Sequence, residues 1–101
     1  MSGKLSIADS LRTIRQFIGV SQVALGEAAG LSSGYVEMLE NKTRQGSLES
    51  VGALAKALCC KPADLLSPPD TQRLLQIRAD NLRRQADEAQ YAAEQADQGA
   101  A

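Results

Sequence analysis

The segment from residue 21 to residue 42 constrains the fold most, because two short helical patterns follow one another with almost no connecting chain. Ser21 and Ser32 each stand where a helix N-cap would accept a backbone hydrogen bond, and Gly30 lies between the two patterns. A glycine past the end of a helix readily adopts the left-handed conformation that stops it. Only Gly30 and Leu31 separate the first pattern from the second cap, so we expect two steeply crossed helices, a helix-turn-helix pair.

Apolar stripes on either side of this pair predict two further helices. A stripe with four-three-four spacing predicts a helix over residues 7–18, with Ser6 as its N-cap and Gly19 at its end. A second stripe predicts a helix that begins after Ser47. The stripes consist of Ile7, Leu11, Ile14 and Ile18, and of Leu48, Val51, Leu54, Ala55 and Leu58.

A short fifth helix is expected before the chain breaks at Ser67-Pro68-Pro69. Pro62 suits its first turn, where a missing N–H costs nothing, and Leu65 and Leu66 are expected to close the core. Residues 1–66 therefore predict an all-α, five-helix domain.

Residues 70–98 predict one additional long helix, because they are rich in Ala, Gln, Arg, Asp and Glu and contain no Gly or Pro. Asp70 suits the N-cap, and residues 99–101 are expected to fray. Small and apolar residues recur at alternating spacings of four and three, the a/d pattern of helices that pair. This heptad seam consists of Leu75, Ala79, Leu82, Ala86, Ala89 and Ala93, and its pattern extends to Ala96.

The seam predicts dimerisation, although alanine buries little surface and the pairing would be weak on its own. Leu74 and Ile77 lie off the seam and are expected to pack against the domain or against a partner's domain. Two alternatives remain open: a solitary solvent-facing helix, and a helix that binds a different protein.

The net charge of the chain allows binding to a phosphate-rich partner such as DNA but does not by itself indicate one. The chain carries a net charge of −1, with +1 in residues 1–66 and −2 in residues 67–101. A small domain needs only a few well-placed cations to bind phosphates, so the acidic tail predicts modest non-specific affinity.

Several classes of function are disfavoured by what the sequence lacks. No apolar run approaches the roughly 18 residues of a membrane helix, and the N-terminus lacks a signal-peptide core, so we expect a cytoplasmic protein without a membrane partner. There is no His, and the only cysteines, Cys59 and Cys60, are adjacent, so we expect no metal site and no cofactor. The sequence contains neither a phosphate-binding glycine loop nor paired carboxylates in a likely cleft, so we expect that the protein is not an enzyme.

Residues 7–66, about 60% of the chain, resemble the Cro/lambda-repressor-type helix-turn-helix family, also called the xenobiotic-response-element family of bacterial and phage regulators. The matching strings are Leu11-Arg12-x-x-Arg15, Gly19-Val20-Ser21-Gln22, Ala28-x-Gly30-Leu31-Ser32, Tyr35-Val36-x-x-Leu39-Glu40-Asn41 and Ser47-Leu48-Glu49…Leu54-Ala55-Lys56-Ala57-Leu58. The resemblance implies a five-helix fold whose third helix enters the major groove of double-stranded DNA. The chain departs from the family at Gly26, where Ala is usual and Gly should cost up to about 1 kcal/mol, at Lys42, where Gly is usual, and at Lys61, which replaces the usual cap.

Carried onto this sequence, the resemblance predicts three sets of site residues. Five residues of the third helix are expected to face away from Val36 and Leu39 and to contact bases: Ser33, Gly34, Tyr35, Glu37 and Met38. Phosphates are expected at Gln22, Arg12, Lys42, Thr43 and Arg44, with Lys4 as a further candidate. The family also pairs Arg15 with Glu40 in a structural salt bridge. The alternative interpretations are a solvated Gln22, a Glu37 that only repels phosphate, and cations that serve solubility.

Two functions follow from these predictions. The first is a sequence-specific regulator, most simply a homodimeric repressor of a plasmid, phage or accessory operon that binds a two-fold symmetric operator. The second is a protein-interaction module, antitoxin-like or regulator-sequestering, that keeps the helix-turn-helix as a scaffold and binds its partner through the C-terminal helix.

Overall fold

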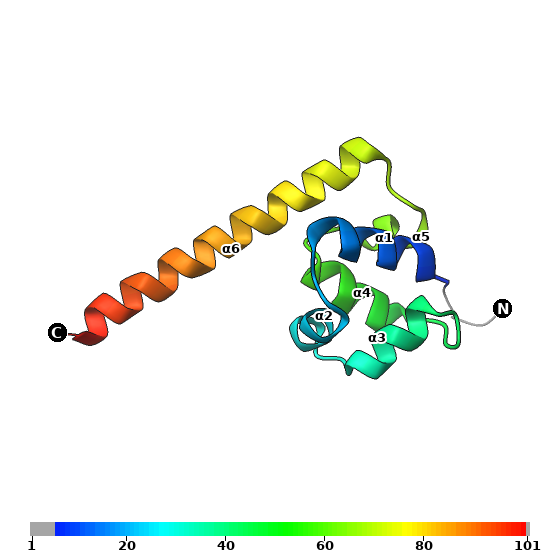
Figure 1. Cartoon of the computed structure of the whole chain (residues 1–101), viewed down its shortest axis with the longest axis horizontal. Coiled ribbons are helices and arrows are strands. Elements are labelled where there is room, and N and C mark those ends of the chain that lie inside the picture. Colours follow the sequence, from blue (N-terminus) through cyan, green and yellow to red (C-terminus); the bar gives the residue numbers. More distant parts are fainter. Residues whose placement is uncertain (1–5, 101) are drawn as a thin grey trace.

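Residues 6–100, which the computed structural model describes with side chains up to residue 95, form six helices and no strand (Figure 1). The helices are α1 (Ala8–Ile18), α2 (Gln22–Ala29), α3 (Ser33–Glu40), α4 (Leu48–Ala57), α5 (Pro62–Leu66) and α6 (Thr71–Ala100). The expected all-α class, with five short helices and one long C-terminal helix, is confirmed. The last helix continues through Gly99 and Ala100, past the predicted end at residue 98.

All six helices contribute side chains to one hydrophobic core. Its buried members are Ile7, Leu11, Ile14, Leu25, Val36, Leu39, Val51, Leu54, Ala55, Ala57, Leu58, Leu65 and Ile77. Most of them belong to the predicted stripes, because burial of these apolar faces is the main favourable term in folding. The shared core fixes the position of α3 relative to the rest of the domain.

The serines and the glycine predicted to cap the helix-turn-helix form the expected contacts. The Ser21 hydroxyl oxygen accepts a hydrogen bond from the backbone N–H of Ala24 at 3.0 Å. The Ser32 hydroxyl oxygen accepts one from the backbone N–H of Tyr35 at 3.1 Å. Gly30 has the left-handed φ of +73° that closes α2 and turns the chain into α3. The compact helix-turn-helix is thus defined by hydrogen bonds close in sequence.

Three details of the predicted helices are wrong, and one of them is Leu66, which was expected to close the core and is 47% exposed. Helix α1 has Ile7 at its N-cap rather than Ser6, and no side chain caps it. The Ile7 side chain is instead buried in the core, so apolar packing fixes where this helix begins. Leu48, predicted to lie on the buried stripe of α4, is 75% exposed, because the first residue of that helix lies outside the bundle.

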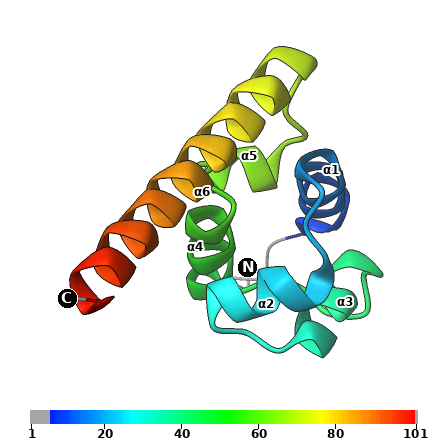
Figure 2. The ribbon, with the colours of Figure 1, turned by 60° about the vertical axis from the view of Figure 1, so that its left-hand side comes forward.

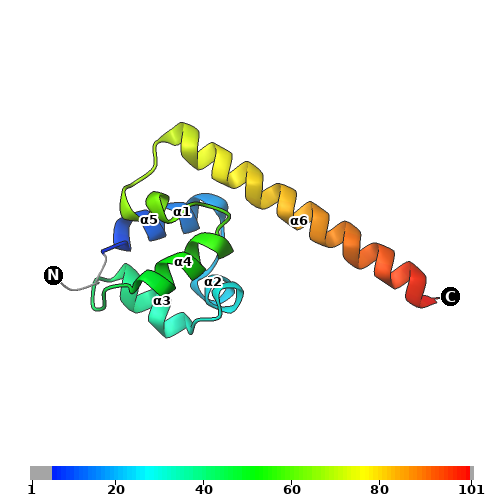
Figure 3. The same cartoon turned by 180° about the vertical axis from the view of Figure 1, so that it is seen from behind.

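Helix α6 packs on the domain with its N-terminal half and extends away from it with its C-terminal half (Figures 2 and 3). Ile77 is fully buried and Leu74 is half-buried against the core, so both pack on their own domain. The Asn81 side-chain amide donates to the Leu58 carbonyl oxygen at 2.6 Å, and Arg84 donates to that of Ala57 at 2.9 Å. These contacts satisfy carbonyls that the end of α4 leaves without helical partners.

Gly26 has a packing role that helix propensity alone does not reveal. A Cβ atom at this position would lie 2.7 Å from the Leu31 carbonyl oxygen and 3.2 Å from the Ser33 amide nitrogen. Both are backbone atoms, so α3 would have to move to accommodate a side chain. We therefore expect Gly26→Ala to lower the free energy of unfolding by roughly 1 kcal/mol, because the overpacking penalty exceeds the gain in helix propensity.

Gly52, inside α4, provides the matched control, since a Cβ atom there would meet no atom within 4 Å apart from the neighbouring backbone of its own helix. Gly52→Ala is expected to raise the free energy of unfolding by about 0.5–1 kcal/mol. Urea denaturation followed by circular dichroism measures both changes. If both variants gained stability equally, the close approach at Gly26 would not exist in solution.

Candidate nucleic-acid interface

Helix α3 presents one face to solvent and the opposite face to the core. Val36 and Leu39 are buried, whereas Ser33, Gly34 and Glu37 are exposed. The helix is only eight residues long, so its orientation depends on contacts that hold it to the bundle.

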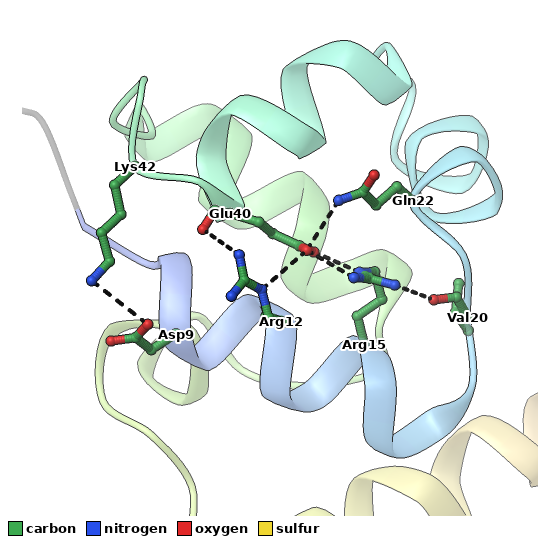
Figure 4. Close-up of polar contacts among 7 residues, drawn as sticks. All are labelled: Asp9, Arg12, Arg15, Val20, Gln22, Glu40 and Lys42. Atoms are coloured by element: carbon green, nitrogen blue, oxygen red, sulfur yellow. Dashed lines mark hydrogen bonds and ion pairs between the residues drawn. The ribbon is translucent and has the colours of Figure 1, made fainter.

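Glu40, the last residue of α3, is the centre of those contacts (Figure 4). Its side chain is only 2% exposed. Arg15 of α1 binds it with two nitrogens, Nε to Oε2 at 2.5 Å and Nη2 to Oε1 at 2.8 Å. The Gln22 amide of α2 donates to Oε1 at 3.1 Å, and Arg12 donates to the Glu40 backbone carbonyl at 2.9 Å. The ion pair expected between Arg15 and Glu40 is present and joins α1 to α3, and the Gln22 hydrogen bond adds α2.

These partners keep Glu40 ionised. Burial by itself raises the pKa of a carboxyl group. Hydrogen bonds from Arg15 and Gln22, together with the charges of Arg15 and Arg12, outweigh burial and hold the pKa of Glu40 below its usual 4.5. The same hydrogen bond to Glu40 raises the pKa of Arg15. The pair is therefore fully charged at neutral pH.

The loop after α3 gathers polar and cationic groups beside the exposed face. It borders an open hollow of about 960 Å³ that is lined by Tyr35, Lys42, Thr43, Arg44, Gln45, Gly46 and Ser47. The Asn41 carboxamide oxygen accepts hydrogen bonds from the backbone N–H and the hydroxyl of Thr43, and the Arg44 N–H donates to the Met38 carbonyl. Lys42 has a positive φ of 66°, which explains why glycine is usual here in the resembled family. The loop is thus an ordered platform for two cations.

Tyr35 connects this loop to α4, and the prediction that it faces wholly away from the core is wrong. Its hydroxyl donates to the Ser50 hydroxyl oxygen at 3.1 Å, and its half-buried ring packs against the core. The Arg44 guanidinium lies over the ring, 5.4 Å from its centroid, within the range of a cation–π interaction. Tyr35 and Arg44 are each expected from the sequence, whereas their pairing depends on how the loop folds back and has no signal in the sequence.

No match was found among family models or among curated proteins. Solved structures similar to the chain include the DNA-binding domain of the P22 C2 repressor in solution, with 30% identity over 69% of this chain and 96% of that one and a TM-score of 0.57. The chain belongs to the Cro/lambda-repressor-type helix-turn-helix family. The clp gene regulator ClgR from Corynebacterium glutamicum is also similar, with 27% identity over 87% of this chain and 84% of that one and a TM-score of 0.56.

The remaining residues predicted from the Cro/lambda-repressor-type resemblance differ in their freedom to bind a ligand. Met38 is half-buried, and Lys42, Thr43 and Arg44 are exposed, although Lys42 pairs with Asp9 at 3.8 Å. Gln22 and Arg12 are partly committed to Glu40, although the Arg12 side chain is still 49% exposed. Lys4 lies outside the described residues.

In this helix-turn-helix protein the heptad seam lies outside the core. Leu75 is 51% exposed and Leu82 is 57% exposed. The other seam positions, Ala79, Ala86, Ala89 and Ala93, are exposed as well, and the side chain of Ala96 lies outside the described residues. The seam is thus available to a partner in a single copy of the chain.

One of the two cysteines of this family member, Cys60, is not a reactive thiol. Burial, together with the nearby charge of Asp64, raises the pKa of Cys60 to about 12, so its thiol stays protonated. Among the described side chains, no group of three His, Cys, Asp or Glu residues is placed to hold a metal ion. Nor does any described helix have the length and apolar character needed to cross a bilayer.

Proposed function

We propose that the chain is a sequence-specific DNA-binding regulator that inserts α3 into the major groove of double-stranded DNA. The observation that carries this proposal is the solvent-facing side of α3, held outward by the Glu40 contacts and bordered by the cationic loop. A major groove about 12 Å wide accepts a helix, and every base pair presents a distinct pattern of groups there. The two similar proteins are named as a repressor DNA-binding domain and as a gene regulator, which supports the same conclusion.

The chemistry of the exposed α3 residues suits base recognition. Gly34 has no side chain and allows the helix to approach base edges closely. The Ser33 hydroxyl donates or accepts hydrogen bonds, the Glu37 carboxylate accepts from a cytosine amino group, and Met38 suits a thymine methyl group. Tyr35 offers its ring edge, since its hydroxyl is occupied by Ser50.

Phosphate contacts come from the loop and from the N-terminus of α2. Arg44 and Lys42 supply charge, and Thr43 supplies a hydroxyl. Gln22 and Arg12 bind phosphate only with the atoms that Glu40 leaves free. These contacts set the position of α3 in the groove without reading sequence.

The regulator acts as a homodimer through the heptad seam and represses an operon of plasmid, phage or accessory type from a two-fold symmetric operator. A single eight-residue reading helix contacts few base pairs, and pairing two copies doubles the sequence that is read. The exposed Leu75 and Leu82 provide the apolar contact for that pairing.

Arg44→Ala tests the proposed phosphate contacts of the loop after α3. We expect weaker binding to all duplexes alike and a salt dependence of log K against log[salt] that is shallower by about one unit. Lys56→Ala is the matched control, since exposed Lys56 lies near the far end of α4 from the loop, and it should leave both quantities unchanged. Gel shifts on DNA from upstream of the gene, over a salt series, measure both.

A second candidate function is the protein-interaction module. It is favoured by the acidic total charge and by Glu37 on the face that would approach phosphate. If the chain bound no DNA with salt-sensitive affinity, and Arg44→Ala behaved like Lys56→Ala, the module would be the better account and the DNA-binding proposal would fail.

A further inference from the structure

Helix α6 has two faces with different roles. Leu74, Ile77, Asn81 and Arg84 contact the domain and repeat at intervals of three, four and three. At 100° per residue this face lies nearly opposite the heptad seam. The domain therefore leaves the seam accessible from Leu75 to Ala93 instead of covering one side of it.

The two halves of α6 carry opposite charge. Residues 71–84 hold four Arg and one Asp, a net charge of +3, whereas residues 85–98 hold four acidic residues and no cation, a net charge of −4. Part of the positive charge is already used, because Arg73 pairs with Asp64 at 2.9 Å. Arg83 in the first half, and Asp87 and Glu94 in the second half, are exposed to solvent.

The two halves of the seam also differ in volume. Leu75 and Leu82, both in the first half, are the large members, and the second half consists of alanines. Large residues pack well against small ones, because facing layers then interdigitate without voids. If the helices paired in parallel, leucine would face leucine at one end and alanine would face alanine at the other. The helices would then be held far apart at the first end and packed loosely at the second.

We propose that two copies of the chain pair their α6 helices in antiparallel orientation through the heptad seam, an inference that rests on the proposed homodimer. Antiparallel pairing sets each positive half against the negative half of its partner and each leucine against alanine. Parallel pairing would set like-charged halves side by side.

Antiparallel pairing also gives a role to the projecting half of α6. That half extends beyond its own domain (Figures 1 and 3). In the pair it lies along the domain-supported half of the partner's helix, and the two helix-turn-helix domains stand at opposite ends of the pair. The two-fold axis is then perpendicular to the helices and passes near their common midpoint.

Distances between spin labels at single cysteines distinguish the two orientations. Gln72 is near the start of α6 and Gln85 is near its middle, and both are exposed. In the antiparallel dimer we expect a short distance between labels at 85 and a distance longer by roughly 30–40 Å between labels at 72, from the 1.5 Å rise per residue. Equal short distances at both sites would overturn the antiparallel orientation while leaving the homodimer intact.

The labelled chains require replacement of Cys59 and Cys60, so the unmodified protein supplies a second measurement. Sedimentation equilibrium from about 50 to about 500 mM NaCl should show a dimer dissociation constant that rises at least about threefold, because salt screens attraction between opposite charges. A constant that falls with salt would overturn the proposal. A chain that stayed monomeric would overturn the proposed homodimer as well, and a dimer with long distances at both sites would overturn pairing through α6. DNA binding is tested separately through Arg44.

Discussion

Replacing Glu40 with alanine is expected to lower the free energy of unfolding by about 3–5 kcal/mol. The change leaves the largely buried Arg15 guanidinium without its carboxylate partner, and the cost of an unpaired charge exceeds the worth of the pair itself. It also removes the acceptor of Gln22, so α2 and α3 lose their shared contact with α1. Urea denaturation followed by circular dichroism, at one fixed protein concentration, measures the loss.

Glu37→Ala is the control for this experiment. It makes the same substitution one turn earlier in α3 at an exposed position, and it should change stability by no more than about 0.5 kcal/mol. If Glu40→Ala prevents folding, Glu40→Gln keeps the side-chain shape and one acceptor oxygen and should give a smaller, measurable loss. Equal effects at positions 40 and 37 would show that the Glu40 contacts do not hold α3 in place.

The same contacts predict loss of stability in acid. The pKa of Glu40 is lower in the folded chain than its ordinary value of 4.5, so the unfolded chain takes up a proton first as the pH falls. The contribution of Glu40 is therefore complete above about pH 4.5 and is lost as the pH falls through the depressed folded-state value. Asp64, whose pKa is lowered mainly by its hydrogen bond from Arg73, acts in the same direction. Glu40→Gln should flatten this part of the stability profile.

Replacing Ile77 with alanine is expected to cost about 2–5 kcal/mol, the range for truncating a large buried aliphatic side chain. Ile77 is fully buried, although it belongs to the helix that extends away from the domain. Its loss would leave a cavity between α6 and the core and weaken the contacts through which Asn81 caps α4. Denaturation at low protein concentration separates this effect from any contribution of dimerisation.

Leu82→Ala is the counterpart of this substitution on the opposite face of α6. Leu82 is 57% exposed, so truncation should change monomer stability little while it weakens self-association. Ile77→Ala should do the reverse, with a large loss of monomer stability and little direct effect on self-association. A chain whose stability was insensitive at Ile77 would have α6 detached from the domain in solution.

The parts of the fold that could be predicted from sequence depend on local chemistry. Ser21 and Ser32 each stand directly before a helical pattern and cap the helix that follows. Gly30 ends α2 because glycine tolerates a positive φ. The Arg15–Glu40 pair was predicted from the family resemblance and not from spacing, since the two residues lie 25 positions apart.

The parts that could not be predicted depend on contacts between distant segments. In the sequence, Tyr35 cannot be told from an exposed aromatic residue. Only the structure shows that its hydroxyl donates a hydrogen bond to Ser50 of α4. Gly26 looks unfavourable in a helix until the backbone of the following turn is seen to exclude a side chain. The seam of α6 was visible as a heptad pattern, whereas its opposite face carries the polar Asn81 and Arg84, whose partners are the last carbonyls of α4.

Selection of bound duplexes from a randomised DNA pool tests the central claim most directly, that the exposed side of α3 reads base pairs. The protein should enrich a two-fold symmetric site, and Glu37→Gln should change the preferred base at one position of each half-site from cytosine toward adenine, since a Gln amide pairs with adenine. Arg44→Ala should enrich the same site with lower affinity. Enrichment of no sequence, or of an unchanged site by Glu37→Gln, would contradict the account.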